Sequence, residues 1–390
     1  MTDARTDLGI GMVGYAFMGA AHSQAWRTAP AFFDLPLHPR MTAICGRDEE
    51  AATKVAQRFG WESVETDWRA LLKRDDIDVI DICTPGDTHA EIAIAALQAG
   101  KHVLCEKPLA NSVREAEAMA AAAAVAPGLA MVGFTYRRTP AVALAQKLVA
   151  DGRIGTIRHV RAQYLQDWLT DENAPLNWRL DKDKAGSGSL GDIGAHIIDM
   201  AQFVTGSQIQ SVNGMLETFV KTRPIGGEHA TLGGSSSSDA ERGPVTVDDA
   251  AVFTARFVDG AIGVFEATRF ANGRKNALRL EVNGTLGSLA FDFEDMNVLE
   301  YFDGTEDPSI AGFRRIIVTE ASHPYIAAWW PPGHGLGYEH GFTHQVVDLV
   351  RDIAAGRQPR PSFDDALQVQ RVLAAVEESA GGGSAWTPIG

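Results

Sequence analysis

The sequence predicts an α/β protein of two domains, and three observations lead to this fold class. The chain has 390 residues, which is long for a single hydrophobic core. Its first third alternates continuous apolar runs with helical runs, the pattern of a doubly wound parallel sheet covered on both faces. The pattern then changes to strand-like runs joined by turns. These runs predict an α+β domain with a large, open-faced, mostly antiparallel sheet.

The elements of the first domain follow one another in alternation. Five strands are predicted, over residues 8–14, 40–46, 76–85, 101–109 and 129–137. Four helices are predicted between them, over residues 20–29, 48–60, 88–100 and 111–126. Two of these helices end at a glycine, the residue that most readily stops a helix.

The second domain is expected to begin near Arg137 to Pro140, which gives the boundaries 1–137 and 138–390. Its strand-like runs cover residues 156–168, 211–220, 246–270, 275–293 and 297–302. Helices are expected over residues 187–204, 339–356 and 362–380. A segment rich in glycine and serine, residues 233–244, is expected to form a mobile loop.

Charge and composition exclude several classes of partner. The net charge is −15, from 35 basic and 50 acidic residues, so nucleic acids and other anionic polymers are disfavoured. The chain has no apolar run of about 18 residues, which argues against a membrane span, and no signal peptide is expected. Three cysteines in apolar runs indicate buried, reduced thiols and a cytoplasmic protein. A small, neutral molecule is the expected partner.

A glycine-rich turn follows the first strand. Aligned on the dinucleotide pattern G-x-G-x-x-G, it places Gly14, Ala16 and Gly19 at the three glycine positions, with Phe17 and Met18 between them. The methyl group of Ala16 departs from the pattern where the pyrophosphate approaches the backbone. The turn predicts a Rossmann-type dinucleotide site, and a strand-to-helix turn without a ligand is the alternative.

The end of the second strand distinguishes NAD from NADP. Gly46 stands where an acidic residue would bind the ribose hydroxyls, and Arg47 and Asp48 follow it. Arg47 can hold a 2′-phosphate or stack on adenine, and Asp48 can still reach the ribose. A solvated loop charge is the alternative for Arg47. Taken alone, this position favours NADP slightly.

Polar residues also follow the third, fourth and fifth strands, at the edge where ligands bind in a parallel sheet. They lie in the stretches 84–89, 106–108 and 134–137. Lys107 comes directly after an apolar strand, where a lysine needs a task or a partner. An exposed loop lysine is the alternative. The Lys107–Pro108 pair suggests a fixed loop, with a cis bond as one possibility.

The predicted helix over 187–204 carries two stripes at helical spacing. Ile193, Ile197 and Met200 form the apolar stripe, and the polar stripe consists of Asp192, His196 and Asp199. A buried structural histidine is the alternative for His196. Gly191 and Gly194 keep the first turn slim, which leaves room for a ligand.

In this order, "GYAFMG", "TPGDTHAEIAIAALQAGKHVLCEKPLA" and "GDIGAHIIDM" resemble the Gfo/Idh/MocA family of oxidoreductases over nearly the whole chain. The resemblance implies a Rossmann domain, an open-sheet domain, and NAD(P)-dependent oxidation of a sugar or cyclitol hydroxyl. It implies catalytic roles for Lys107, Asp192 and His196. Within the family, three further stretches are most similar to the enzymes that oxidise the C3 hydroxyl of levoglucosan (1,6-anhydroglucose). They cover residues 134–149, 163–179 and 185–201. That similarity favours NAD over NADP. Inositol and glucoside 3-dehydrogenases remain alternatives.

The chemistry assigns a role to each catalytic candidate. An imidazole suits removal of the hydroxyl proton, so His196 is expected to be the base, with a neutral to alkaline optimum. Lys107 would donate to the substrate oxygen, and Asp192 would orient or charge-balance the lysine and the imidazole, or bind a neighbouring hydroxyl. Asp199 would support His196 or cap a local structure.

The remaining candidates bind ligands. The residues expected to bind the cofactor are Gly14, Phe17, Met18, Gly19, Arg47, Thr84, Pro85, His89, Glu106, Lys107, Trp178 and Arg179. Those expected to bind the sugar are Lys107, Tyr136, Gln166, Trp168, Asp192, His196 and Tyr338. Domain packing is the alternative for the aromatic residues. No metal is expected, and a structural role is favoured for His334, His340 and His344.

Two other functions are compatible with the same fold. One is NAD-assisted glycoside cleavage, in which the cofactor is regenerated. The other is a protein that binds a nucleotide without turnover. Because the exposed face of a large sheet needs covering, a homo-oligomer, either a tetramer or a dimer, is also predicted.

Overall fold

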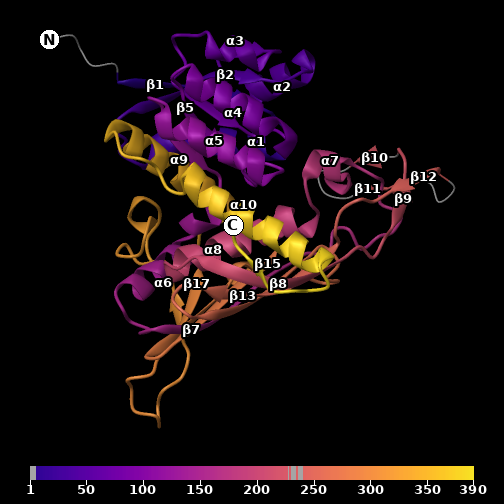
Figure 1. The fold of residues 1–390 in the computed structure, drawn as a ribbon. Coiled ribbons are helices and arrows are strands. Elements are labelled where there is room, and N and C mark those ends of the chain that lie inside the picture. Colours follow the sequence, from indigo (N-terminus) through magenta and orange to yellow (C-terminus); the bar gives the residue numbers. More distant parts are fainter. Residues whose placement is uncertain (1–5, 227, 230–233, 236–239) are drawn as a thin grey trace. The chain divides into compact units, whose positions relative to one another are not determined.

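The computed structural model describes residues 6–226, 228–229, 234–235 and 240–390. The chain forms two compact units, shown in Figure 1. The first comprises Met1–Arg138 and Gly337–Leu367, and the second comprises Thr139–Leu336 and Gln368–Gly390.

The first unit is built on a parallel six-stranded sheet in the order β3-β2-β1-β4-β5-β6. Its strands are β1 (Asp7–Val13), β2 (His38–Cys45), β3 (Ser63–Glu65), β4 (Val79–Ile82), β5 (His102–Cys105) and β6 (Ala130–Val132). Its helices are α1 (Phe17–Phe32), α2 (Glu49–Phe59), α3 (Trp68–Leu72), α4 (His89–Gln98), α5 (Val113–Val125) and α9 (Tyr338–Ala354). The strand order reverses between β1 and β4, which is where ligands bind in this fold. The predicted parallel sheet is confirmed.

The assignment of all residues after 137 to the second domain is corrected for Gly337–Leu367. This segment joins the first unit because α9 packs along α1. The backbone N–H of Val132, at the end of β6, also donates to the carbonyl of Pro361 over 3.0 Å. The periodicity of a helix shows that one face is buried, but not which neighbour buries it.

The second unit contains a nine-stranded sheet in the order β18-β17-β16-β15-β7-β14-β13-β8-β19. Its strands are β7 (Ile157–Leu165), β8 (Ile209–Glu217), β13 (Ala250–Phe257), β14 (Ile262–Thr268), β15 (Ala277–Gly284), β16 (Gly287–Asp292), β17 (Val298–Asp303), β18 (Arg314–Ile317) and β19 (Thr387–Pro388). β7 and β14 pair in parallel, and the other pairs are antiparallel. The predicted mostly antiparallel sheet is confirmed.

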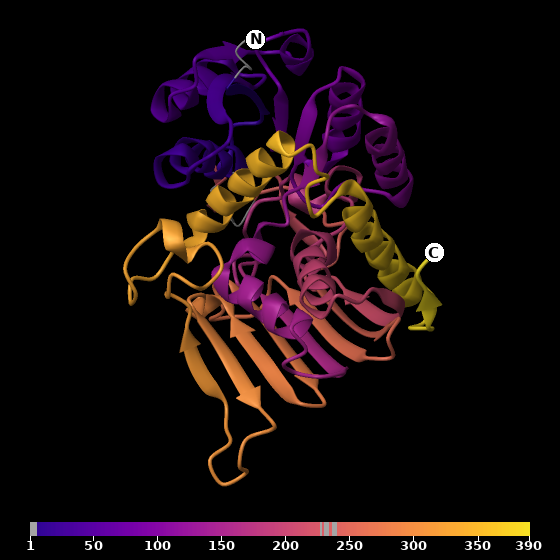
Figure 2. The ribbon, with the colours of Figure 1, turned by 90° about the vertical axis from the view of Figure 1, so that its left-hand side faces the viewer.

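Helices cover one face of this sheet. Figure 2 shows α6 (Pro140–Ala150) and α8 (Ala195–Thr205) against the strands, and α8 packs on β7 and β15. The opposite face exposes Met215, Val252, Ile262 and Val264, whose exposed fractions are 60, 42, 49 and 44 %. In this unit as described, the sheet therefore has one covered face and one partly apolar open face.

Further elements complete the chain. They are α7 (Lys182–Ala185), the short strands β9 (Thr222–Pro224), β10 (Glu228–His229), β11 (Gly234–Ser235) and β12 (Arg242–Pro244), and α10 (Phe363–Gly381), which begins in the first unit and ends in the second. The loop predicted over 233–244 lies partly outside the described residues. Its described part includes the short strands β11 and β12.

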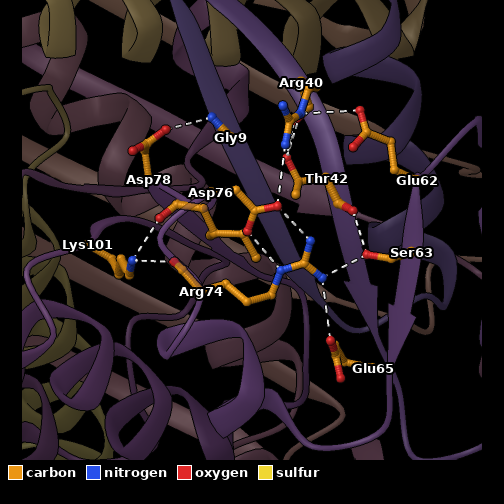
Figure 3. Close-up of polar contacts among 11 residues, drawn as sticks. Gly9, Arg40, Thr42, Glu62, Ser63, Glu65, Arg74, Asp76, Asp78 and Lys101 are labelled. Atoms are coloured by element: carbon orange, nitrogen blue, oxygen red, sulfur yellow. Dashed lines mark hydrogen bonds and ion pairs between the residues drawn. The ribbon is translucent and has the colours of Figure 1, made fainter. Parts of the chain in front are cut away.

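A polar network ties together the amino-terminal edge of the first sheet (Figure 3). The guanidinium of Arg74 donates to both carboxylate oxygens of Asp76, over 2.9 and 2.8 Å, and to Ser63 Oγ over 2.8 Å. Lys101 Nζ donates to the carbonyls of Arg74 and Ile77 over 2.9 and 2.8 Å. Because ligands bind at the other end of the strands, this network serves stability.

We expect His344 to make the protein less stable in acid. The His344 ring is fully buried in α9, and its Nδ1 lies 2.9 Å from the carbonyl oxygen of Arg138. Burial lowers the pKa of His344 to about 3, against about 6.5 in an unfolded chain. Between these values only the unfolded chain binds the proton. The free energy of unfolding therefore falls as the pH falls, by up to about 1.4 kcal/mol per pH unit.

Urea unfolding at two pH values tests this expectation. Between pH 7.5 and pH 4.5, His344→Gln should lose less stability than the unaltered protein. Equal losses in the two proteins would rule out His344 as a source of acid sensitivity.

Candidate active site

The turn after β1 has the geometry of a phosphate-binding loop. Gly14 has a φ of 101°, and a Cβ at Gly19 would lie 2.3 Å from the carbonyl oxygen of Gly14. Helix α1 begins at Phe17, and the residue before it, Ala16, provides no side-chain cap. The first turn also contains no acidic residue. A helix N-terminus of this kind favours an anion, so the loop fits the pyrophosphate of a dinucleotide.

The structure explains why Gly46 replaces the usual acidic residue. A Cβ at Gly46 would lie 1.9 Å from Cε1 of Tyr15, so the tyrosine ring occupies the space of a side chain. Tyr15 was not among the predicted residues. Arg47 is exposed, and the carboxylate of Asp48 accepts the N–H of Ala51 over 3.0 Å and caps α2. Asp48 therefore has a structural role of its own.

The turn after β4 is linked to the turn after β5. The ring of His89 is buried, with Nε2 2.8 Å from the carbonyl oxygen of Thr84 and Nδ1 3.0 Å from that of Pro108. Thr88 Oγ1 donates to Thr84 Oγ1 over 2.7 Å, and Pro85 between them is exposed. The contacts of His89 brace the two turns against each other.

The turn after β5 holds Lys107. The Lys107–Pro108 bond is cis, as the sequence suggested. Glu106 is buried, and its Oε2 accepts the backbone N–H of Lys107 over 3.2 Å. The Lys107 residue itself is half-buried. The lysine therefore extends from a turn whose backbone is fixed by the preceding carboxylate.

Two predicted tyrosines lie near this turn. Burial raises the pKa of the Tyr338 hydroxyl, and the neighbouring Tyr136 and Glu106 raise it further. The ring of Phe17 stacks on that of Tyr338, with centroids 6.3 Å apart and an interplanar angle of 12°. Within the first unit, the structure thus brings together the dinucleotide loop, Tyr136, Tyr338 and the Lys107 turn.

The predicted helix with the polar stripe begins differently from the expectation. Residues Leu190–Gly194 form a π-helical turn, η4, which continues into α8. Its wider turn alters the expected side-chain spacing, and π-turns are frequent at functional sites. Asp192 is 31 % exposed at its side chain. His196 and Asp199 are 9 and 2 % exposed. Of the polar stripe, Asp192 is thus the most accessible member.

Within its own unit, Asp192 is paired with an arginine that was not among the predicted site residues. Arg269 follows β14, is fully buried, and places Nη1 3.5 Å from Oδ2 of Asp192. Its guanidinium also lies 5.3 Å from the ring centroid of Trp168 and donates to the carbonyl of Asp248 over 3.2 Å. A charged residue at the end of an apolar strand is the signal that could have identified it.

A hydrogen-bonded chain of aromatic and amide groups lies beside His196. The Tyr164 hydroxyl and Gln166 Nε2 donate to Oδ1 of Asn276, over 2.6 and 2.8 Å, and Trp168 Nε1 donates to Gln166 Oε1 over 2.8 Å. The rings of Tyr164 and His196 have centroids 5.9 Å apart. β7 ends at Leu165, so Gln166 and Trp168 follow the strand, whereas the sequence predicted a strand-like run as far as residue 168. Asn276 was not predicted.

Trp178 and Arg179 also belong to the second unit. They lie in the short helix η3 (Trp178–Leu180), with the Arg179 guanidinium 4.5 Å from the ring centroid of Trp178. Burial lowers the pKa of Arg179, and the charge of Asp192 opposes this shift. Trp178 and Arg179 therefore belong to the same unit and the same charged surroundings as Asp192 and Arg269. The glycine loop belongs to the first unit.

The three histidines considered for a metal have separate partners. His334 Nδ1 lies 2.9 Å from the carbonyl oxygen of Pro331, and His340 Nδ1 accepts the N–H of Gly337 over 3.0 Å. His344 faces the carbonyl of Arg138. Each of these three rings therefore contacts a backbone group.

The fold and these two sets of residues define a class of protein. The first unit has a doubly wound sheet with a loop that fits a dinucleotide. The second unit has an imidazole, a carboxylate and hydrogen-bonding groups that suit a sugar. This combination is typical of a nicotinamide-dependent oxidoreductase. The family comparisons agree. Residues 8–134 match the oxidoreductase family with the NAD-binding Rossmann fold, and residues 142–290 match the GFO/IDH/MocA C-terminal domain. The chain belongs to the Gfo/Idh/MocA family of oxidoreductases and contains its NAD-binding domain.

Several relatives are similar over their full length. Levoglucosan dehydrogenase of Pseudarthrobacter phenanthrenivorans is 44% identical over 378 residues, which cover 96% of each chain. The crystal structure of an oxidoreductase domain protein from Kribbella flavida has a TM-score of 0.94 and 69% identity, covering 99% of this chain and 100% of that one. A levoglucosan dehydrogenase in complex with NADH and levoglucosan has a TM-score of 0.92 and 42% identity, covering 98% and 99%.

Proposed function

We propose that the protein is an NAD-dependent dehydrogenase that oxidises levoglucosan to 3-keto-levoglucosan. The observation that carries this proposal is the 44% identity to levoglucosan dehydrogenase over 96% of both chains. This similarity includes both the NAD-binding unit and the unit with Asp192 and His196. The amide and indole groups beside His196 support a polar, neutral ring as the substrate.

The proposed reaction removes a proton from a hydroxyl oxygen and a hydride from its carbon. His196 takes the proton from the oxygen. Lys107 donates a hydrogen bond to that oxygen and stabilises the negative charge that develops on it. Asp192, held by Arg269, hydrogen-bonds a neighbouring hydroxyl or orients the imidazole. The nicotinamide ring supplies the hydride acceptor when the cofactor is bound.

The remaining predicted ligand-binding residues keep their proposed roles. The glycine loop, Arg47, Thr84 and Pro85 hold the dinucleotide. Tyr136, Gln166, Trp168 and Tyr338 bind the sugar, and Trp178 and Arg179 contact the nicotinamide. His89 and Glu106 contribute through the turns that they brace.

A substrate panel tests the proposal. Levoglucosan, myo-inositol, glucose and a methyl glucoside are each incubated with NAD or NADP, and the nicotinamide absorbance is followed. We expect the highest kcat/KM with levoglucosan and NAD, and a ketone at C3 in the product by NMR. Activity confined to inositol or to a glucoside would assign the protein to one of the alternative dehydrogenases. Glycoside cleavage without net NADH would favour the NAD-assisted hydrolytic reaction.

We further propose that the open face of the nine-stranded sheet joins copies of this chain in a homotetramer or dimer. The face presents Met215, Val252, Ile262 and Val264 to solvent in the single chain. Met215 and Val252 are paired across β8 and β13, so the apolar side chains are contiguous. Exposed apolar patches of this kind mark protein contacts.

The expected result is that Val264→Glu dissociates the oligomer. A carboxylate on each copy places like charges in an apolar contact, which is unfavourable by several kcal/mol. Light scattering at micromolar concentration measures the mass. Val125→Glu, at a residue that is 85 % exposed on the first unit, is the matched control and should leave the mass unchanged. A monomeric unaltered protein would contradict the proposal.

A cytoplasmic location is part of the same proposal. The three cysteines, Cys45, Cys83 and Cys105, are free and buried, which suits a reducing compartment. In the described part of the chain, no helix is both long and apolar enough to span a membrane.

A further inference from the structure

A cluster of charged side chains is buried beneath the turn that carries Lys107. His22 of α1, Asp81 of β4 and Glu106 have exposed fractions of 0, 0 and 4 %. His22 Nδ1 lies 2.9 and 3.0 Å from the two carboxylate oxygens of Asp81, and His22 Nε2 lies 2.9 Å from Oε1 of Glu106. The other oxygen of Glu106 accepts the backbone N–H of Lys107. The contacts therefore form a continuous path from His22 to the lysine.

The geometry fits a doubly protonated imidazole. An ionised carboxylate only accepts hydrogen bonds, and each ring nitrogen of His22 faces one. A neutral ring would direct a lone pair at a carboxylate oxygen. Burial by itself lowers the pKa of His22, but the charge and hydrogen bond of Asp81 bring the net pKa well above the usual value. The raised pKa favours the doubly protonated ring, which can donate to both carboxyl groups.

The surroundings hold both carboxylates in place. Trp26 Nε1 donates to Oδ2 of Asp81 over 2.7 Å, and the thiol of Cys83 lies 3.6 Å from Oδ1. A Cβ at Gly133 would lie 2.6 Å from Oε1 of Glu106, so the glycine leaves the space that this carboxylate fills. Asp81 thus has three donors, and the position of Glu106 is set by His22, Gly133 and the Lys107 amide.

We propose that His22 is a positioning residue for Lys107: it fixes the Glu106 carboxylate, which in turn fixes the backbone from which the lysine extends. This inference rests on the proposed function, in which Lys107 donates to the reacting oxygen. His22 itself touches no substrate. A displacement of about 1 Å in a catalytic group can reduce turnover about 100-fold, and this is the loss expected in His22→Gln.

A double-mutant cycle tests the path. His22→Gln and Lys107→Ala are made singly and together, and kcat, KM and the dissociation constant of NADH are measured. If His22 acts through Lys107, His22→Gln lowers kcat about 100-fold in the unaltered protein but less than about threefold in the Lys107→Ala background. If the kcat losses of the two single variants multiply in the double variant, His22 supports stability alone and the inference is overturned.

His344→Gln is the matched control. His344 is also fully buried in the first unit, but it faces a backbone carbonyl and not a carboxylate. It should lower the melting temperature at pH 8 while kcat stays within about threefold. An equal loss of kcat in both histidine variants would show that the effect is general loosening of the unit, which contradicts the proposal.

A spectrum of the unaltered protein tests the same point if the His22 variant does not fold. At pH 8.5, a long-range ¹H–¹⁵N spectrum should show a histidine ring with both nitrogens protonated, and a NOESY spectrum should connect this ring to the Trp26 indole proton. A neutral ring at this position would overturn the inference. So would one equivalent of metal bound at His22, Asp81 and Cys83, which lie close enough to ligate one.

Failure of this inference is distinguishable from failure of the proposed function. If Lys107→Ala retains normal turnover, the proposed role of the lysine fails and the path from His22 has no target. If Lys107→Ala loses turnover and His22→Gln multiplies that loss, only the inference about His22 fails.

Discussion

Replacing His196 with alanine is expected to lower kcat by between about 10²- and 10⁴-fold, the contribution typical of a general base. The substrate hydroxyl cannot release its proton to solvent quickly enough without an acceptor at this position. NADH binding should change by less than about threefold, because His196 is not among the residues proposed to hold the dinucleotide. Steady-state kinetics and a fluorescence titration with NADH measure the two quantities.

Two controls separate the loss of a base from a loss of structure. Free imidazole should restore part of the activity of His196→Ala, because it can enter the space left by the ring and accept the proton. His323→Ala removes an imidazole from the same unit whose Nδ1 accepts the N–H of Glu320, and it should leave kcat unchanged. Retention of kcat within about tenfold in His196→Ala would remove His196 from the mechanism.

The sequence predicted the first sheet well because each of its longer strands is buried on both faces. β4, for example, is buried along its whole length, and apart from Asp81 it appears as an apolar run. β3 and α3 were missed because three and five residues are too few to show a periodicity. The place of α9 in the first unit was not predictable, since amphipathicity does not identify the neighbour that covers the apolar face.

Some site residues could be predicted from the sequence, and others could not. Lys107 and His196 could be selected because polar residues at strand ends or on a helical stripe stand out against an apolar background. Asp81 lies inside an apolar strand and was passed over, although a carboxylate there needs a donor. Its partner His22 is 59 positions away in the sequence, and such pairings are established only by tertiary contact. Arg269, by contrast, directly follows an apolar strand and could have been selected by the same signal as Lys107.

Lys107→Ala is expected to lower kcat by between about 10²- and 10³-fold, the loss typical when one donor to a developing oxyanion is removed. The matched control is Lys101→Ala. β5 (His102–Cys105) separates the two lysines, so Lys101 precedes the strand and Lys107 follows it.

Lys101 donates to two backbone carbonyls at the amino-terminal edge of the sheet. Lys101→Ala should lower the melting temperature and leave kcat unchanged. Lys107→Ala should lower kcat and leave the melting temperature unchanged. The contrast follows from the direction of the strands, because a parallel sheet binds its ligands at the carboxyl end alone. Equal kinetic losses in the two variants would show that turnover depends on the integrity of the sheet and not on the ammonium group of Lys107.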